Sequence, residues 1–281
     1  MAKLIFSGHE TFSCKLHWLK RGYEFVVNKY NFNDEEAVVR LGVGKNMVAS
    51  IKYYMKAFGL LNQDGYLEDI AHKLFDSENG FDPFLEDIGS LYLLHFLIVN
   101  TNHATAYKTT FIDYHSQRNT IEKNKLQNFI KHICFDNAGY QNIYNENTVK
   151  KDINVLIHNY YNKSISNIED SNTIFAQLNL IRETEEGTFV FNYENKTNVP
   201  PKIFLYALLH SFHDNNSISF EMMRDLALTF CLTNNDLLNI IKQLCIDYSG
   251  ILVFSDVAGI KELQIKGELS KDQVLKNYYI G

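Results

Sequence analysis

Residues 34–65 read DEEAVVRLGVGKNMVASIKYYMKAFGLLNQDG and carry the clearest structural pattern of the chain. Its apolar residues recur at helical spacing, and the pattern is interrupted where Gly42 and Gly44 stand. We expect a short helix over 34–41 and a longer helix over 45–58. The segment therefore predicts two helices joined by a glycine bend.

The spacing inside this stretch is typical of a helix-turn-helix. Such a unit needs a small or apolar residue in its first helix and a glycine about four residues later. It then needs apolar residues about six and nine positions beyond the glycine, where the second helix packs on the first. These places are held by Val38, Gly42, Val48 and Ile51. The apolar stripe continues through Met55 and Phe58 at helical spacing.

The opposite face of the longer helix is basic and polar, and no acidic residue occurs between Ala37 and Gln63. Lys, Asn, Ser and Tyr side chains suit the major groove and phosphates of DNA. We expect DNA contacts from Lys45, Asn46, Ser50, Lys52, Tyr53 and Lys56. A small hairpin over 60–67 would be the wing. The alternatives are a solvated basic face and a protein-interaction module.

The sequence GVGKN at 42–46 also suggests a phosphate-binding loop. The nucleotide-binding motif requires a glycine five positions before Gly44 and a Ser or Thr after the lysine. Val39 and Asn46 stand at those two positions. We therefore expect no nucleotide cofactor, although the helix N-terminus remains suited to a DNA phosphate.

The charge of the chain is unevenly distributed. The 281 residues carry a net charge of −6. Residues 1–63 hold nine Lys or Arg and five acids, which gives 9 − 5 = +4, so the remainder carries −6 − 4 = −10. This balance argues against nonspecific coating of nucleic acid by the whole surface and favours a basic N-terminal contact region.

Four cysteines without close pairing, and no apolar run long enough for a signal peptide or a membrane span, predict a cytoplasmic protein with no membrane partner. The cysteines are Cys14, Cys134, Cys231 and Cys245.

The rest of the chain predicts further helices and two hairpins. Before the helix-turn-helix, we expect a helix over 12–29. After it, we expect helices over 66–76, 85–99, 121–134, 147–161, 171–180, 201–213, 217–229 and 234–247. Hairpin turns are expected at Glu186-Gly187 and near Gly259.

The expected fold class is mainly α with small β-hairpins. The expected domains are a winged helix-turn-helix over 1–75, a helical middle region over 76–165, and a winged-helix-like unit over 166–281.

The opening motif FSGHETF, residues 6–12, places His9 beside Glu10. A histidine next to a carboxylate suits acid–base chemistry or a divalent metal ion, so both are candidate catalytic residues. The alternative is a hydrogen-bonded cap in which Ser7 or Thr11 starts the following helix.

Two weaker patterns also suggest a metal-dependent site. Asp256, Gln264 and Lys266 loosely fit an acid…Gln-x-Lys nuclease pattern, for which a plain hairpin is the alternative. His210 and His213 lie three apart with Asp214 beside them, but no third ligand follows from spacing.

Three motifs carry a family resemblance. FSGHETF at 6–12, WLKRGY at 18–23 and LGVGKNMV at 41–48 resemble a bacterial family of unknown function that is encoded beside sulfur-transfer genes for DNA phosphorothioation. The family includes SspB-type components of the single-strand phosphorothioation defence system. The resemblance implies a role in phosphorothioate modification and phage restriction, and it leaves DNA nicking open. It implies DNA, sulfur-transfer enzymes and an ATPase as partners, and it fixes no catalytic residue.

Three hypotheses follow. The chain is a DNA-binding component of a modification or defence complex, with or without nicking activity. It is a non-enzymatic DNA-binding adaptor or transcriptional regulator. Or it is an interaction scaffold that does not touch DNA.

Overall fold

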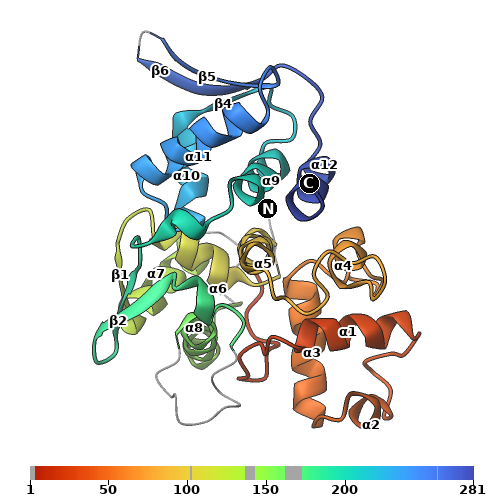
Figure 1. The fold of residues 1–281 in the computed structure, drawn as a ribbon. Helices are drawn as coiled ribbons and strands as arrows, with labels where there is room; N and C mark the ends of the chain where they lie inside the picture. Colours follow the sequence, from red (N-terminus) through yellow and green to blue (C-terminus); the bar gives the residue numbers. More distant parts are fainter. Residues whose placement is uncertain (1–3, 102, 137–142, 162–172, 258) are drawn as a thin grey trace. The chain divides into compact units, whose positions relative to one another are not determined.

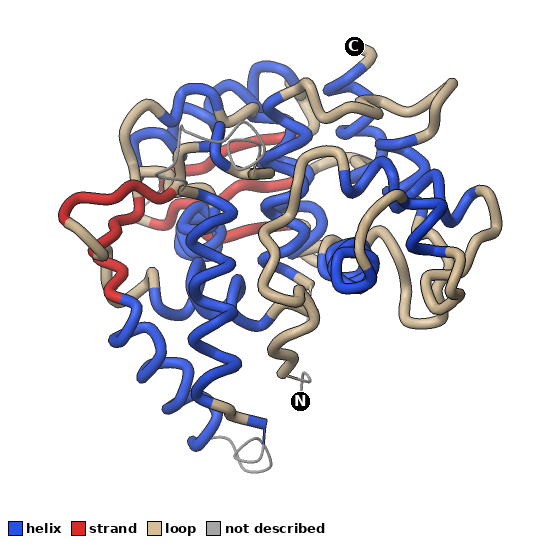
Figure 2. Tube along the Cα trace, turned by 90° about the horizontal axis from the view of Figure 1, so that it is seen from below, coloured by secondary structure: helices blue, strands red, loops and turns tan. Residues whose placement is uncertain are grey.

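The computed structural model describes residues 4–101, 103–136, 143–161, 173–257 and 259–281. Over these residues the chain is mainly helical, with two small antiparallel sheets (Figures 1 and 2), which confirms the expected fold class at that level. The chain forms two compact units, Met1–Asn192 and Tyr193–Gly281. This division differs from the expected boundaries at 75 and 165, because the hairpin after residue 180 pairs with a strand of the first unit.

The first unit holds α1 to α8 and one three-stranded sheet. The elements are α1 (Trp18–Val27), α2 (Ala37–Leu41), α3 (Lys45–Ala57), α4 (Asp69–Phe75), α5 (Ile88–Asn100), α6 (Thr105–Lys108), the π-helix η1 (Thr109–Tyr114), β1 (Thr120–Glu122), α7 (Lys123–Asp136), α8 (Glu146–Tyr160), the 3-10 helix η3 (Ala176–Leu178), β2 (Ile181–Glu185) and β3 (Thr188–Phe191).

Helices α1, α2 and α3 pack closely around the predicted apolar stripe. Val48, Ile51, Met55 and Phe58 are buried, as expected. α1 approaches α3 at Gly22, where a Cβ would lie 2.8 Å from Cγ of Met55, so a side chain at this position would separate the two helices. The bend between α2 and α3 begins at Gly42, which ends α2 in a left-handed conformation.

Helix α5 lies inside the first unit. Its residues from Gly89 to Val99 are all buried, which matches a helix that is apolar on every side. The one buried histidine on it, His95, meets the Tyr160 hydroxyl of α8 at 2.7 Å. Among the described residues, no helix has both the length and the apolar character needed to cross a bilayer.

The sheet of the first unit has the order β1-β3-β2, with both pairs antiparallel. The expected turn at Glu186-Gly187 joins β2 to β3. Ile121 of β1 pairs with Phe189 of β3, and both side chains are buried. The sheet therefore ties the hairpin to the helices that precede it.

The second unit has a helix–strand–helix–helix–hairpin order. Its elements are η4 (Lys196–Asn198), α9 (Pro201–Ser211), β4 (Ser217–Ser219), α10 (Phe220–Thr229), α11 (Asn234–Asp247), β5 (Leu252–Val257), β6 (Ile260–Ile265) and α12 (Lys271–Tyr279). The sheet order is β4-β6-β5, and Leu263 of β6 pairs with Ile218 on one side and Phe254 on the other.

Three local expectations were wrong. The first helix begins at Trp18 and not near residue 12, because the Cys14 N–H bonds to Asn159 and Lys15 forms a β-bridge with Thr173. The hairpin over 60–67 is reduced to one bridge between Leu61 and Leu67. Of the helix expected over 171–180, only η3 forms, and 171–172 lie outside the described residues.

Candidate nucleic-acid interface

The accessible face of α3 is a narrow basic stripe. Lys45, Ala49, Lys52 and Lys56 follow one another at helical spacing, and all four are at least partly exposed. Asn46 is also exposed beside the first lysine. We call these five residues the α3 stripe. It contains four of the six expected contact residues and no acid, so its charge is positive along its whole length.

Ser50 and Tyr53 were wrongly expected on this face. Both are buried, with exposed fractions of 0% and 8%. Ser50 Oγ lies 2.9 Å from the carbonyl oxygens of both His9 and Asn46. The Tyr53 ring packs edge-on against His9, and burial raises its pKa well above the usual value. The reason is the N-terminal loop, which covers this flank of α3; Ala49 is exposed instead.

The N-terminal end of α3 is open to an anion. Its N-cap, Gly44, has extended backbone and no side chain that could accept from the first N–H groups of the helix. The first turn carries Lys45 and Asn46 and no acid. Backbone N–H groups and the helix dipole favour a phosphate at such an end.

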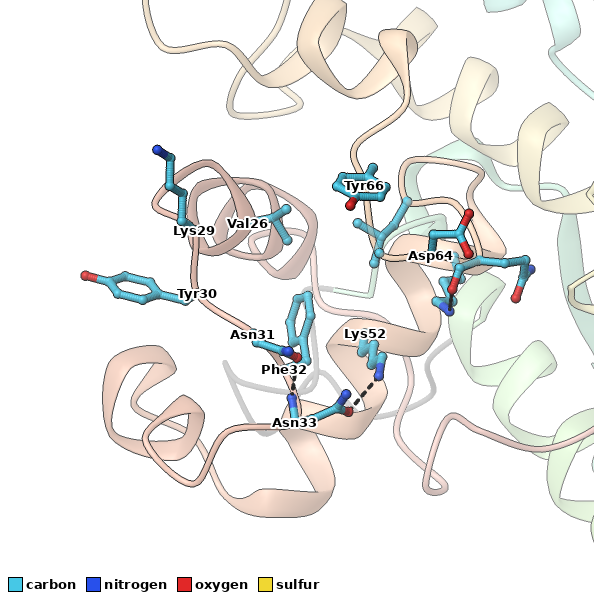
Figure 3. A pocket seen from close by; sticks show the side chains of 13 residues that line it. Val26, Lys29, Tyr30, Asn31, Phe32, Asn33, Lys52, Asp64 and Tyr66 are labelled. Atoms are coloured by element: carbon cyan, nitrogen blue, oxygen red, sulfur yellow. Dashed lines mark hydrogen bonds between the residues drawn. The ribbon is translucent and has the colours of Figure 1, made fainter.

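The C-terminal half of the α3 stripe borders a groove of about 430 Å³ (Figure 3). Its other walls are Val26 near the end of α1, the following residues 29–33, and the turn around residues 62–66. Lys52 Nζ donates to Asn33 Oδ1 at 2.8 Å, and Lys56 Nζ donates to the Gln63 carbonyl at 3.0 Å. Both lysines thus bond to neutral oxygens. Partial burial, and then the nearby Lys56, lowers the pKa of Lys52. An anion in the groove would offset the repulsion between the two lysines.

The FSGHETF loop is fastened to α8 through Asp152. His9 Nε2 lies 2.8 Å from Asp152 Oδ1, and the Ser7 N–H donates to the same carboxylate at 3.0 Å. The Thr11 N–H donates to His9 Nδ1 at 3.1 Å, which assigns the ring proton to Nε2. The imidazole therefore donates to Asp152 and accepts from Thr11.

A second anchor of this N-terminal segment is Asn159, about two turns further along α8 than Asp152. The Cys14 N–H donates to its Oδ1 at 2.8 Å, and its Nδ2 bonds to the Tyr107 hydroxyl. Tyr54 of α3 donates to the Phe12 carbonyl at 2.8 Å. The loop therefore joins α3 to α8 through buried hydrogen bonds.

These contacts place His9 and Glu10 in the loop. His9 is 4% exposed and both ring nitrogens are engaged, whereas Glu10 is exposed at a positive φ. The two neighbours thus occupy different environments. The geometry supports a positioning role for His9, although not the helix cap expected from Ser7 or Thr11, because no helix starts there.

A family model matches residues 6–279, which is nearly the whole chain; its description is "Protein of unknown function (DUF4007)". The chain belongs to the DUF4007 family. Two crystal structures of SspB, one of them magnesium ion-bound, are similar to it, with a TM-score of 0.84 for each. The identities are 23% and 22%, over 98% of this chain and 88% of theirs. None of the curated proteins matches it.

The described residues of this DUF4007 chain contain no group of three or more His, Cys, Asp or Glu side chains placed to hold an ion. In the nuclease-like pattern, Asp256 faces Lys261, whereas Gln264 faces Val253 farther along the hairpin. His210 meets Lys271 Nζ at 3.3 Å, and its pKa is lowered by burial and then by that lysine.

Proposed function

We propose that this chain is a DNA-binding component of a bacterial phosphorothioate modification and anti-phage defence system, and that α3 is its duplex-binding helix. The observation that carries the proposal is the α3 stripe: three lysines on one accessible helix face that begins at an uncapped N-terminus. Lysines on phosphates supply sequence-independent affinity, and Asn46 would reach a base edge or a sugar.

The setting of the proposal comes from the family motifs and from a fold shared with SspB. Its partners would be sulfur-transfer enzymes and an ATPase of the same system, and its place the cytoplasm. Placing sulfur on a DNA backbone requires protein contact with that backbone, which suits a phosphate-facing helix.

Within this proposal, α1 to α3 form a helix-turn-helix and the second unit forms a winged helix. The order α9–β4–α10–α11–β5–β6, with the sheet order β4-β6-β5, supports the second assignment. The exposed face of α11 carries mainly Asn and Gln side chains, represented by Asn235, Asn239 and Gln243. We assign this face to a protein partner or to secondary DNA contacts.

Salt-dependent binding to a duplex tests the proposal. In Lys45→Ala, the slope of log affinity against log salt should become shallower by about 0.9, the loss expected for one phosphate contact. The matched control is Lys150→Ala, which removes one exposed lysine of α8. An unchanged slope in the first variant would refute the placement of the DNA-binding face.

Nicking separates a modification enzyme from a binding adaptor. Supercoiled plasmid incubated with the protein and Mg²⁺ or Mn²⁺ would relax if the chain cleaves one strand. Binding without relaxation under either ion supports the adaptor or regulator. No duplex binding at all supports the scaffold.

A further inference from the structure

We propose that the groove beside α3 binds an unstacked nucleotide of single-stranded DNA, as a site separate from the duplex contact at the start of α3. The inference rests on the proposed function, because it deepens the DNA-binding role of the α3 region. The juxtaposition that carries it is an exposed tyrosine, two lysines that bond only to neutral oxygens in the groove, and amide side chains in one concave space.

The cations of the groove favour a phosphodiester. Lys29, Lys52 and Lys56 line it, and Asp64 is the one acid among its lining residues, so the local balance is 3 − 1 = +2. Lys52 and Lys56 lie one helical turn apart, close enough for the charge of Lys56 to lower the pKa of Lys52. A phosphate between them would replace repulsion with attraction.

The aromatic component is Tyr66. Its side chain is 71% exposed, so it adds little to the core, yet it lines the groove. The Asn62 side chain accepts from the Tyr66 N–H at 2.9 Å, and the Leu61–Leu67 bridge closes the turn around it. The ring is therefore presented by a fixed turn. An exposed aromatic ring beside lysines is the arrangement on which single-stranded bases stack.

The polar groups can meet the edges of a base. Asn31, Asn33 and Gln63 line the same groove and are exposed. Asn31 Oδ1 accepts from the Asn33 N–H at 2.9 Å, which holds this short loop in place (Figure 3). Amide groups donate and accept, so they suit the edges of an unpaired base and add no charge.

Size and position distinguish this site from the duplex contact. A volume of about 430 Å³ lies within the range of small-ligand sites, roughly 300–1,000 Å³, whereas a duplex has no single protruding group of that kind. Lys56 lies eleven residues beyond Lys45, which is about 16 Å along the helix axis. The two ends of the α3 stripe can thus bind two different forms of DNA.

Fluorescence anisotropy of the full chain tests the inference with two probes: fluorescein-labelled oligothymidine of about 12 nucleotides, and a duplex of similar length. Tyr66→Ala should weaken single-strand affinity at least fivefold and leave duplex affinity within twofold. Tyr66→Phe should retain single-strand binding, because it keeps the stacking ring. Phe84→Ala is the matched control, since this aromatic is 69% exposed outside the groove.

The outcomes separate the two proposals. Lys45→Ala should weaken duplex binding alone. If the natural chain binds duplex but not oligothymidine, or if Tyr66→Ala binds oligothymidine normally, the groove proposal fails and the proposed function stands. If the natural chain binds neither probe, both fail. Because Tyr66 is exposed, the circular dichroism of its variants should match that of the natural chain.

Discussion

Helices α3 and α11, which come third in α1–α3 and in α9–α11, differ most at their N-termini. α11 begins with a capping box, in which the Asp236 N–H donates to Thr233 Oγ1 at 3.1 Å and the Thr233 N–H donates to Asp236 Oδ2 at 3.0 Å. α3 begins at Gly44, which offers no side chain, and continues with a lysine. One helix satisfies and screens its own N–H groups, and the other leaves them for a ligand.

The order of helices does not by itself specify a binding partner. Both regions place an amphipathic helix after a bend, and α11 is followed by the better-formed hairpin. Charge and capping separate them: the α3 stripe is cationic, whereas the exposed polar side chains of α11 are mostly neutral amides. We therefore expect DNA to depend on α3 far more than on α11.

The largest expected effect is on stability, and it comes from removing the side chain that anchors the N-terminal loop against α3. Asp152→Ala removes the acceptor of both the His9 ring and the Ser7 N–H, so unit 1 should lose about 3–4 kcal/mol of stability. Hydrogen–deuterium exchange should report loss of protection in α3 but not in α11. Asp34→Ala, an exposed acid, should change neither helix. Equal loss of protection in α11 would contradict the separate support of the two helices.

A second test isolates the close approach between the loop and α3. A Cβ on Gly8 would lie 2.5 Å from Cδ2 of buried Tyr53, and φ there is +107°. Gly8→Ala should therefore cost about 3 kcal/mol, measured by urea denaturation. Gly65→Ala has a similar positive φ but open space around the Cβ, so it should cost only about 1 kcal/mol. Equal costs would show that the Tyr53 contact is unimportant.

Charge reversal compares the two helices directly. Lys45→Glu in α3 should weaken duplex affinity about tenfold, or about 1.4 kcal/mol, because it replaces a phosphate contact with repulsion. Lys242→Glu, an exposed position of α11, should change affinity less than twofold. Titration of one labelled duplex with both variants is sufficient. A reversed ranking would move the interface to the second unit.

The sequence predicted these helices better than it predicted their surroundings. Local spacing located α3 and its buried residues Val48, Ile51 and Met55, since helical periodicity is a property of neighbouring residues. It could not show that Ser50 and Tyr53 are covered, because the covering loop lies more than forty residues away. The basic half of the candidate site was therefore predictable, and its covered flank was not.

The role of His9 shows the same limit. Its partner Asp152 is 143 residues away in the chain, so no spacing rule connects them. The groove also escaped prediction, because it combines residues of α1, α3 and the turn at 62–66 that meet only in the folded chain. Strand β1 was missed for a related reason: three residues are too short a pattern, and the β3 partner lies far along the chain.

The smallest expected effect comes from a substitution at Gly44, which should raise stability but lower duplex affinity. Gly44→Asp places an N-cap acceptor on a residue with extended backbone and open space at the Cβ. It should stabilise unit 1 by about 0.5 kcal/mol and weaken duplex binding about threefold. Gly44→Ser supplies the cap without the charge, so it should show the stability gain with a smaller loss of affinity. Stronger binding by Gly44→Asp would show that the open N-terminus faces no phosphate.

The hydrogen bonds from Ser7 and His9 to Asp152 have a consequence for biosynthesis. The start of the chain finds its partner only after residue 152 has left the ribosome, which takes roughly 8–30 s at about 5–20 residues per second. Until then, the loop that covers Ser50 and Tyr53 has its bonds to α3 but lacks its anchor on α8. Helix α3, which we propose to face DNA, should thus be translated early and reach its final packing late, and nascent chains shorter than 152 residues should bind DNA poorly.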